Sequence, residues 1–302
     1  MRRDAGMINV MSLLLPTVAG LVAGYGGWLA HREGIYWGFG TDFLATLLLT
    51  GVFSALLLGA TQLLAVTVAE GRAVKAIAQF LLATGVALAI TMTGAVLYAL
   101  LRDWLVLEQH MSAMMLRTLW WATLATTLSV ARAILYGTPL AGLQAFAGLF
   151  PALLLGGLLF DTQFGPREQT LIGLLLLGGL AGLSLGMTVE FCKYAWLEEH
   201  GAGLWKVQFL LDRDTFSVGA NDQCDFTVPD DLDMAFEVHE REGFHVLQVL
   251  PEAPMVTING ARVRCRTLVE GDALQIGTRV FIYHNRFATA RDAMLESAGV
   301  NT

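Results

Sequence analysis

The feature that most constrains this chain is a series of long apolar stretches in its first two thirds. A membrane-crossing helix needs roughly 20 predominantly apolar residues. Stretches of about that length occur at 8–30, 43–69, 76–101, 118–136, 140–160 and 170–192. Hydrophobic residues make up 55% of the chain and charged residues 15%, which excludes an ordinary soluble protein. We predict an α-helical transmembrane bundle of about six glycine-rich helices.

The charges divide the chain into two regions. Residues 1–202 contain 10 Lys and Arg and 11 Asp and Glu, whereas residues 203–302 contain 9 and 15. We therefore predict a transmembrane domain at 1–202, a second domain at 203–286 and a C-terminal tail at 287–302. The net charge of −7 argues against nucleic-acid binding, which needs a basic face. Three cysteines are too few for a disulfide framework.

Lysine and arginine in short loops set the orientation of a membrane protein, because they collect on the cytoplasmic side. With six helices, both termini lie on one side of the membrane, and that side has more of the loop lysines and arginines. Its members are Arg2, Arg3, Arg72, Lys75, Arg132, Lys193 and Lys206, against Arg32, Arg102, Arg117 and Arg167. The sequence thus predicts a multi-pass protein of the inner (plasma) membrane with both termini in the cytoplasm.

Small residues recur every fourth position in two of the predicted helices. The series are Gly178, Gly182 and Gly186, and Gly51, Ala55 and Gly59. This spacing places them on one helix face, where two backbones can approach closely. It predicts tight packing within the bundle or a homo-oligomer. A pore or a substrate path is the functional alternative.

Two charged residues fall inside the apolar stretches near their predicted cytoplasmic ends, Arg132 and Glu190. Ionisable residues within a membrane often mark a functional site, so an intramembrane ion pair is one interpretation. The other is that both side chains extend to the interface. Polar residues at mid-membrane are confined to Thr, Ser and Gln62, which gives a transporter little support.

From residue 205 onward the pattern changes to alternating polar and apolar residues. It is clear at 206–209, 244–249 and 262–266, and such alternation is typical of strands with one buried face. Asn259-Gly260 is a strong hairpin signal, because both residues tolerate positive φ. Many short strands with regular turns predict an all-β sandwich.

Four segments of this region resemble the forkhead-associated (FHA) domain. They are FSVG at 216–219, CDFTVPD at 224–230, VTING at 256–260 and LVEGDALQIG at 268–277. The resemblance covers about 205–285 and implies a β-sandwich that binds phosphothreonine peptides through loops at one end. The whole layout is similar to a group of bacterial multi-pass membrane proteins with a C-terminal FHA domain.

The resemblance fails at the ligand-binding positions. The family's phosphate-binding Arg falls on Ala220, and its Ser-x-x-His motif reads Met234 to Glu237, so of that set only Asn259 remains in register. Asp230, Asp231 and Asp233 crowd the same loop and would repel a phosphate dianion. We therefore predict a degenerate FHA domain that has not retained the phosphothreonine-binding residues.

Three arginines follow the Asn259-Gly260 turn at alternate positions, Arg262, Arg264 and Arg266. On one strand they would project from one face, so these five residues are the predicted partner-binding site. Such a stripe could contact an acidic partner, a phosphopeptide or anionic lipid headgroups. A solvated strand face that discourages edge pairing is the alternative.

The sequence contains none of the common nucleotide-binding, nucleophile or kinase motifs. We expect a non-enzymatic scaffold, recruitment or signalling protein without cofactor or metal. Its partners would be the lipid bilayer and an unidentified cytoplasmic or membrane protein. Two alternatives stay open: a small-solute transporter or channel regulated by the FHA-like domain, and a phosphopeptide receptor that uses the arginine stripe.

Overall fold

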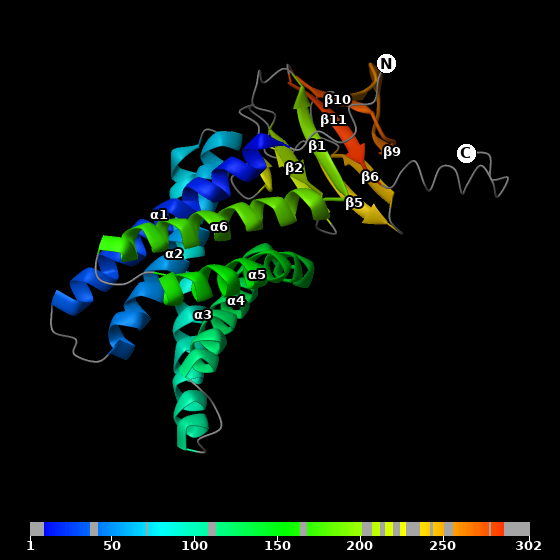
Figure 1. Ribbon diagram of the computed structural model, residues 1–302. Helices are drawn as coiled ribbons and strands as arrows, with labels where there is room; N and C mark the ends of the chain where they lie inside the picture. Colours follow the sequence, from blue (N-terminus) through cyan, green and yellow to red (C-terminus); the bar gives the residue numbers. More distant parts are fainter. Residues whose placement is uncertain are drawn as a thin grey trace. The chain divides into compact units, whose positions relative to one another are not determined.

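Over the residues that it describes, the computed structural model shows six helices followed by eleven strands (Figure 1). By its internal contacts the chain divides into a helical unit, Val10–Thr67 with Gly71–Cys192, and a second unit that contains Lys193–Thr302. The structure describes residues 9–36, 42–70, 72–107, 113–163, 168–200, 207–211, 215–219, 224–227, 236–241, 244–250, 256–277 and 279–286. The predicted tail at 287–302 lies outside these ranges.

Each predicted apolar stretch corresponds to one helix. The six are α1 (Val10–Tyr36), α2 (Asp42–Glu70), α3 (Ala73–Leu107), α4 (Ala113–Tyr136), α5 (Pro139–Gln163) and α6 (Glu168–Cys192). Within the described residues, five of them are long and apolar enough to cross a membrane. The exception is α4, whose Arg, Thr and Ser residues lower its hydropathy. The number of candidate spans is therefore five rather than the predicted six, although α4 packs against both α3 and α5.

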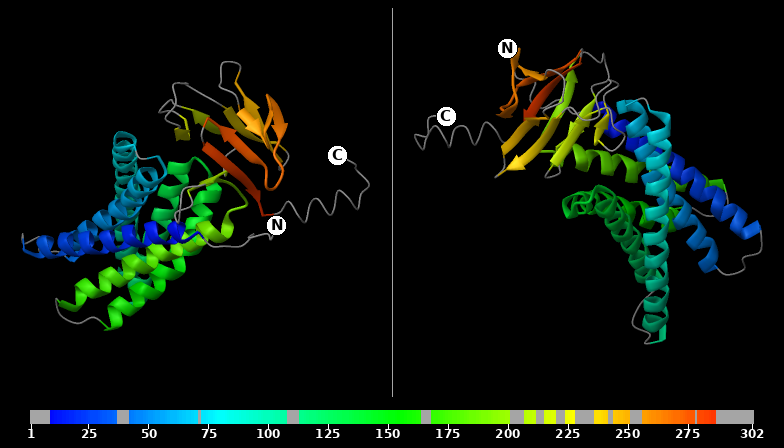
Figure 2. Two further views of the ribbon diagram at one scale, coloured as in Figure 1. Left: turned by 90° about the horizontal axis from the view of Figure 1, so that it is seen from above. Right: turned by 180° about the vertical axis from the view of Figure 1, so that it is seen from behind.

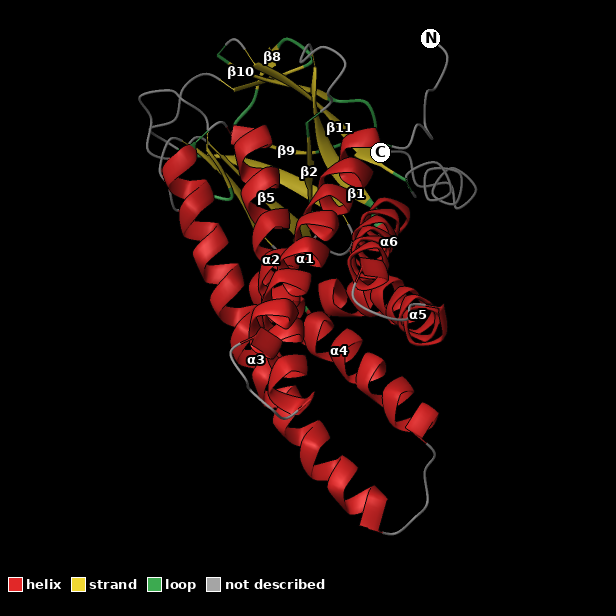
Figure 3. Ribbon diagram, turned by 60° about the vertical axis from the view of Figure 1, so that its left-hand side comes forward, coloured by secondary structure: helices red, strands yellow, loops and turns green. Residues whose placement is uncertain are grey.

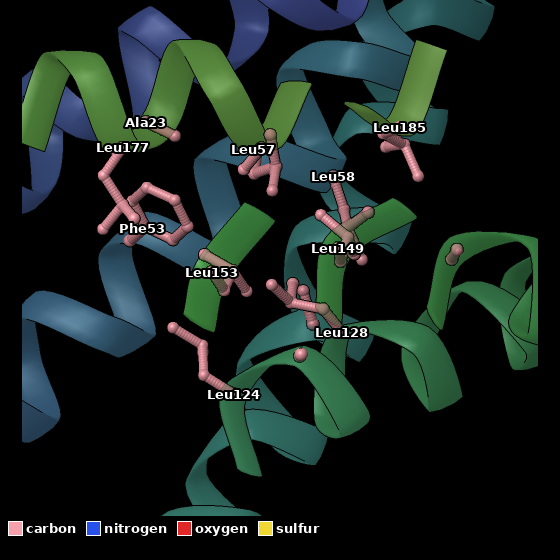
Figure 4. Packing of buried hydrophobic residues seen from close by; sticks show 14 of the residues in the cluster. Ala23, Phe53, Leu57, Leu58, Leu124, Leu128, Leu149, Leu153, Leu177 and Leu185 are labelled. Atoms are coloured by element: carbon pink, nitrogen blue, oxygen red, sulfur yellow. The ribbon is translucent and has the colours of Figure 1, made fainter. Parts of the chain in front are cut away.

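The interior of the helical unit is built from leucine, alanine and phenylalanine. Figure 4 shows Leu124 and Leu128 of α4 close to Leu149 and Leu153 of α5, within a buried apolar cluster that also takes in residues of α1, α2, α3 and α6. Buried polar side chains are few in this unit, and most are Thr or Ser. The hydroxyl groups of Thr61 and Ser129, for example, donate hydrogen bonds to backbone carbonyls of their own helices. The core is thus apolar, and some of its few hydroxyl groups bond within their own helices.

Large apolar side chains also cover the outside of the helical unit. Val74 is 83% exposed, and Leu81, Leu100, Leu143 and Leu155 are exposed as well. A water-soluble bundle would place polar residues at such positions. Helices that are apolar both inside and outside are compatible with a bundle surrounded by lipid.

The glycines of α6 form its contact with α1, and these two helices run side by side in Figures 1 and 2. A Cβ at Gly178 would overlap the carbonyl of Gly20, and one at Gly182 would overlap the carbonyl of Pro16. A Cβ at Gly186 would lie 2.5 Å from the carbonyl oxygen of Ser12. The close packing predicted from the glycine spacing occurs here between two helices of one chain.

The glycines of α2 perform the same role against α3. A Cβ at Gly51 would lie 2.5 Å from the terminal methyl of Met92, and one at Gly59 would meet the side chains of Thr84 and Phe80. These neighbours are side chains rather than backbone, so the α2–α3 contact is less restrictive than the contact of α1 with α6.

The second unit is a sandwich of two sheets, drawn in yellow in Figure 3. One sheet has six strands in the order β2-β1-β11-β10-β7-β8, and the other has five in the order β4-β3-β5-β6-β9. The bounds are β1 Ala195–His200, β2 Gln208–Leu210, β3 Thr215–Gly219, β4 Phe226–Thr227, β5 Phe236–Arg241, β6 Phe244–Val249, β7 Val256–Ile258, β8 Ala261–Arg262, β9 Cys265–Thr267, β10 Ala273–Ile276 and β11 Arg279–Asn285.

The sandwich has its own hydrophobic core between the two sheets. Phe216, Phe226 and Phe236 of one sheet and Phe281 and Tyr283 of the other are buried in it. Their alternation with half-exposed neighbours follows the two-residue period of a strand. The predicted β-sandwich is therefore present in the C-terminal part of the chain.

The boundary between the units differs from the prediction. Strand β1 lies within the region 1–202 that was assigned to the membrane, and it pairs with β11 and β2. Ala195 and Leu197 of β1 are buried in the sandwich core. Only Lys193 and Tyr194 separate α6 from β1. The division consequently falls between 192 and 193, ten residues before the predicted boundary.

We predict that Gly182→Ala destabilises the helical unit, because the added methyl overlaps the backbone of α1 at Pro16. Such overpacking costs about 1–3 kcal/mol. Gly85→Ala is the matched control: Gly85 is also helical, but a Cβ there meets nothing within 4 Å, so higher helix propensity should leave that variant as stable as the wild type or slightly more so. Thermal unfolding of the full chain in detergent measures both. Equal melting temperatures for the two variants would contradict the prediction.

Candidate functional site

The predicted partner-binding residues begin at the turn between β7 and β8. Asn259 and Gly260 have φ of 53° and 82°, and Ile258 pairs with Ala261 across the turn. The hairpin predicted from this dipeptide is therefore confirmed.

The Asn259 side chain is bound within the sandwich. Its Nδ2 donates to Oδ1 of Asp272 at 2.7 Å, and its Oδ1 accepts from the backbone N–H of Ala273 at 3.0 Å. Its backbone N–H donates to the Ala273 carbonyl at 2.9 Å. These bonds attach the turn to the start of β10. Asn259 thus has a structural role, and its carboxamide makes these bonds within the domain.

Asp272 is the centre of this cluster and is only 5% exposed. Its Oδ2 accepts from the backbone N–H of Val269 at 2.9 Å. Nη2 of Arg266 lies 3.7 Å from its Oδ1. A buried carboxylate needs such donors and a counter-charge, so one of the three predicted binding arginines neutralises an internal charge.

The three arginines do not form a stripe on one strand, contrary to the prediction. Arg262 ends β8 at the edge of the six-stranded sheet, whereas Arg266 lies in β9 at the edge of the five-stranded sheet. Between them Val263 packs against the sandwich core, and the chain passes from one sheet to the other. Alternation therefore does not continue through 262–266.

The strand registers show where two of these arginines project. Arg262 pairs with Thr257, which lies between the inward-facing Val256 and Ile258, so Arg262 is on the outer face of its sheet. Arg266 pairs with the buried Leu247 and reaches inward to Asp272. Arg264 is exposed in the connection between β8 and β9. Arg262 and Arg264 are thus the exposed pair.

The loops that would hold phosphothreonine are only partly described. Ala220, Asp230, Asp231, Asp233 and Met234 lie outside the described residues. The flanking strands are described: Oδ2 of Asp225 accepts from both the N–H and the Oγ of Ser217 at 2.9 Å.

Ser217 also pairs across the sheet with Glu237, whose carboxylate lies 3.0 Å from Nε2 of His239. Two carboxylates, those of Asp225 and Glu237, therefore flank Ser217. Glu237 occupies the position at which the FHA resemblance expects a histidine.

A buried histidine that the sequence did not single out lies between the two sheets. His245 is 1% exposed, and its Nδ1 is 2.8 Å from the Tyr283 hydroxyl. Tyr194 lies beside it, with ring centroids 5.8 Å apart, and donates its own hydroxyl proton to Glu240 at 2.8 Å. His245 and Leu247 are two residues apart on one strand, so their side chains point to the same face. This alternation could have predicted the burial of His245.

Burial shifts the titration of both members of this pair. It lowers the pKa of His245, and the Glu240 carboxylate and the backbone of Leu211, which favour the protonated ring, oppose that shift only in part. Burial also raises the pKa of Tyr283 to about 12. Both side chains are therefore neutral near pH 7, and the hydrogen bond between them is part of the core.

Arg132 and Glu190, for which an ion pair was one of two interpretations, do not pair with each other in the helical unit. Glu190 is 3% exposed, and its Oε2 accepts from Oγ of Ser12 in α1 at 2.7 Å. The guanidinium of Arg132 lies over the ring of Tyr136, 4.8 Å from its centroid. The two charges therefore have different neighbours. Among the described residues, no group of three or more His, Cys, Asp or Glu side chains could hold a metal ion.

Comparisons with known proteins gave similarity only to solved structures. No protein-family model and no curated protein matches the chain. A structure of phosphothreonine-dependent FHA domain interactions matches at 19% identity and a TM-score of 0.28, over 30% of this chain and 95% of that one. The FhaA FHA domain, complexed with the intracellular domain of Rv3910, matches at 20% identity and a TM-score of 0.28. That match covers 30% of this chain and 99% of the other.

A third structure covers more of the chain. Mycobacterium tuberculosis EmbR, in complex with a low-affinity phosphopeptide, matches at 15% identity and a TM-score of 0.29, over 89% of this chain and 71% of that one. FHA domains are thus among the similar structures. At these values the similarity says nothing about ligand or partner, which must come from this chain's own residues.

We predict that Asn259→Gly destabilises the sandwich by about 0.5–1.5 kcal/mol, the net contribution of a typical hydrogen bond, because the exposed carboxamide no longer bonds Asp272 and the N–H of Ala273. Glycine keeps the positive φ of the turn, so the variant isolates the lost carboxamide. Arg262→Ala, at the exposed end of the same hairpin, should change stability by less than about 0.5 kcal/mol. Urea unfolding of both variants measures the difference. A stability of Asn259→Gly equal to wild type would show that the carboxamide is not structural.

We predict that the sandwich loses stability as the pH falls below about 6.5, the ordinary pKa of histidine. The folded state lowers the pKa of His245, so between the folded and unfolded values the unfolded state binds more protons, and acid favours unfolding. Each pKa unit of difference is worth about 1.4 kcal/mol.

His245→Gln, which can still hydrogen-bond Tyr283, should remove this part of the pH dependence, while the other histidines of the domain are the same in both proteins. Urea unfolding of residues 193–302, which have their own core, at pH 5 to 8 measures the difference. Parallel pH profiles for the two proteins would refute the assignment.

Proposed function

We propose that this protein is a non-enzymatic, membrane-anchored interaction protein. The helical unit anchors the chain in the inner membrane as a multi-pass bundle with both termini in the cytoplasm. The FHA-like sandwich then recruits a partner protein to that membrane without using the usual phosphothreonine site. The observation that carries this proposal is the joining of an apolar helical unit to a sandwich with its own core.

The outward-facing leucines and valines of the helical unit support the anchor. A surface of exposed large apolar side chains is stable in lipid and prone to aggregation in water. The interior supports an anchor over a transporter, because its buried cluster consists of Leu, Ala, Phe and Trp residues. A solute path would need polar groups converging across the membrane.

The charges of the sandwich support recognition that does not depend on phosphate. Phosphate binding needs a charged fork or several convergent donors. The described strands instead place the carboxylates of Asp225 and Glu237 on either side of Ser217. Arg266 is paired with Asp272. We place the partner contact at the exposed Arg262 and Arg264, which suit an acidic protein surface.

The test compares the full chain with a version that ends at residue 192, each purified from membranes by an affinity tag. We expect both to remain in the membrane fraction after a carbonate wash, and only the full chain to retain partner proteins. Phosphatase treatment of the lysate should leave those partners bound. Arg262→Glu with Arg264→Glu should reduce their yield several-fold, because each opposite-charge contact becomes repulsive.

Arg241→Glu is the matched control, since it makes the same charge change at an exposed position on β5. It should retain the partners. Loss of the partners after phosphatase treatment would favour the phosphopeptide receptor instead. Release of both chains by the carbonate wash would refute the membrane anchor, whatever the partners do.

A further inference from the structure

Arg132 is a buried cation in the interior of the helical unit. It is 6% exposed and lies one helical turn after Leu128, which is fully buried in the core. Four residues later on the same helix, Tyr136 places its ring beneath the guanidinium at 4.8 Å. Arg132 is thus held in a fixed position by an aromatic face.

The guanidinium has hydrogen-bonding capacity that the described residues do not use. Its Nε is buried and has no hydrogen-bond partner among them, and none of the described carboxylates forms an ion pair with it. The other buried charge of this unit, Glu190, is bound to Ser12. A buried charge without a counter-charge is unfavourable, so the geometry calls for an anion from outside the chain.

The free edge of the guanidinium selects the kind of anion. The Tyr136 ring lies against the guanidinium, 4.8 Å from its central carbon. The guanidinium Nε is fully buried, whereas the two Nη atoms are not among the fully buried unpartnered atoms of the described residues. The N–H groups at that end of the planar group point in parallel, and this pair matches two oxygens of a phosphate. Gln62 of α2 donates its Nε2–H to the Tyr136 hydroxyl at 2.9 Å, so the phenolic proton remains for the same ligand.

The position along the helices indicates where that phosphate comes from. Arg132 lies one turn before the end of α4, and Gln62 lies in the last third of α2. Given the membrane placement proposed above, on which this step rests, that level is near the headgroups rather than the bilayer centre. We infer that Arg132, Tyr136 and Gln62 form a binding site for the phosphate group of an anionic phospholipid.

The test is a titration of the purified full chain in a nonionic detergent, followed by native mass spectrometry. The probes are phosphatidylglycerol, phosphatidylcholine and inorganic phosphate. We expect phosphatidylglycerol to bind best, and Arg132→Gln to weaken it about tenfold, as expected for the loss of charge-assisted hydrogen bonds. Arg132→Lys keeps the charge but lacks the two parallel donors, and should weaken binding several-fold.

Arg72→Gln is the matched control, because Arg72 is a half-exposed cation beside the start of α3. It should change the affinity less than twofold. Equal losses for Arg72→Gln and Arg132→Gln would show a general charge effect and overturn the site. Unchanged binding by Arg132→Lys would overturn the two-donor geometry, and is informative even if Arg132→Gln does not fold.

Inorganic phosphate distinguishes the two sources of the ligand. It should not displace phosphatidylglycerol at equal concentration, because it lacks the acyl chains. Displacement that depends on Arg132 would assign the site to a small anion and overturn the lipid assignment. These measurements are made in detergent, so their failure leaves the carbonate-wash test of membrane anchoring untouched.

Discussion

The close approach of α1 and α6 is the contact on which the helical unit depends. Glycines at 20, 178 and 182 allow the two backbones to touch, and no larger residue fits there. Because α1 is the first helix and α6 the last, this contact closes the unit on itself. It also fixes Ser12 beside Glu190, so that a buried carboxylate gains a donor near the end of α6. The hydrogen bond between Ser12 and Glu190 therefore depends on the close backbone packing that the glycines allow.

The sandwich depends on a different feature, a polar cluster around the buried Asp272 beside one hairpin. Asp272 collects donors from Asn259, Val269 and Arg266, which belong to three separate parts of the unit. These contacts all come from residues that the structure describes. A sandwich fold does not by itself fix the ligand chemistry at its surface, so the fold alone does not establish phosphothreonine binding.

The sequence was informative wherever local pattern decides structure. Each apolar stretch became a helix, and Asn259-Gly260 became the turn between β7 and β8. It failed where tertiary context decides. Strand β1 was missed because only two residues separate it from α6, too few to show as a linker. The arginine stripe was wrong because alternation does not reveal where a chain changes sheets, and Val263, anchored in the core, marks that place.

The candidate sites show the same limit. Asn259 was correctly placed at a turn, but its partner Asp272 is brought to it by the pairing of β7 with β10, which no local pattern contains. An ion pair of Arg132 with Glu190 was one interpretation, because they lie at similar predicted depth, yet depth does not specify position around a bundle. The α1–α6 contact brings Ser12 to Glu190, while Arg132 stacks on Tyr136. Glu190 is thus bound within the chain, whereas Arg132 keeps a donor that no described residue uses.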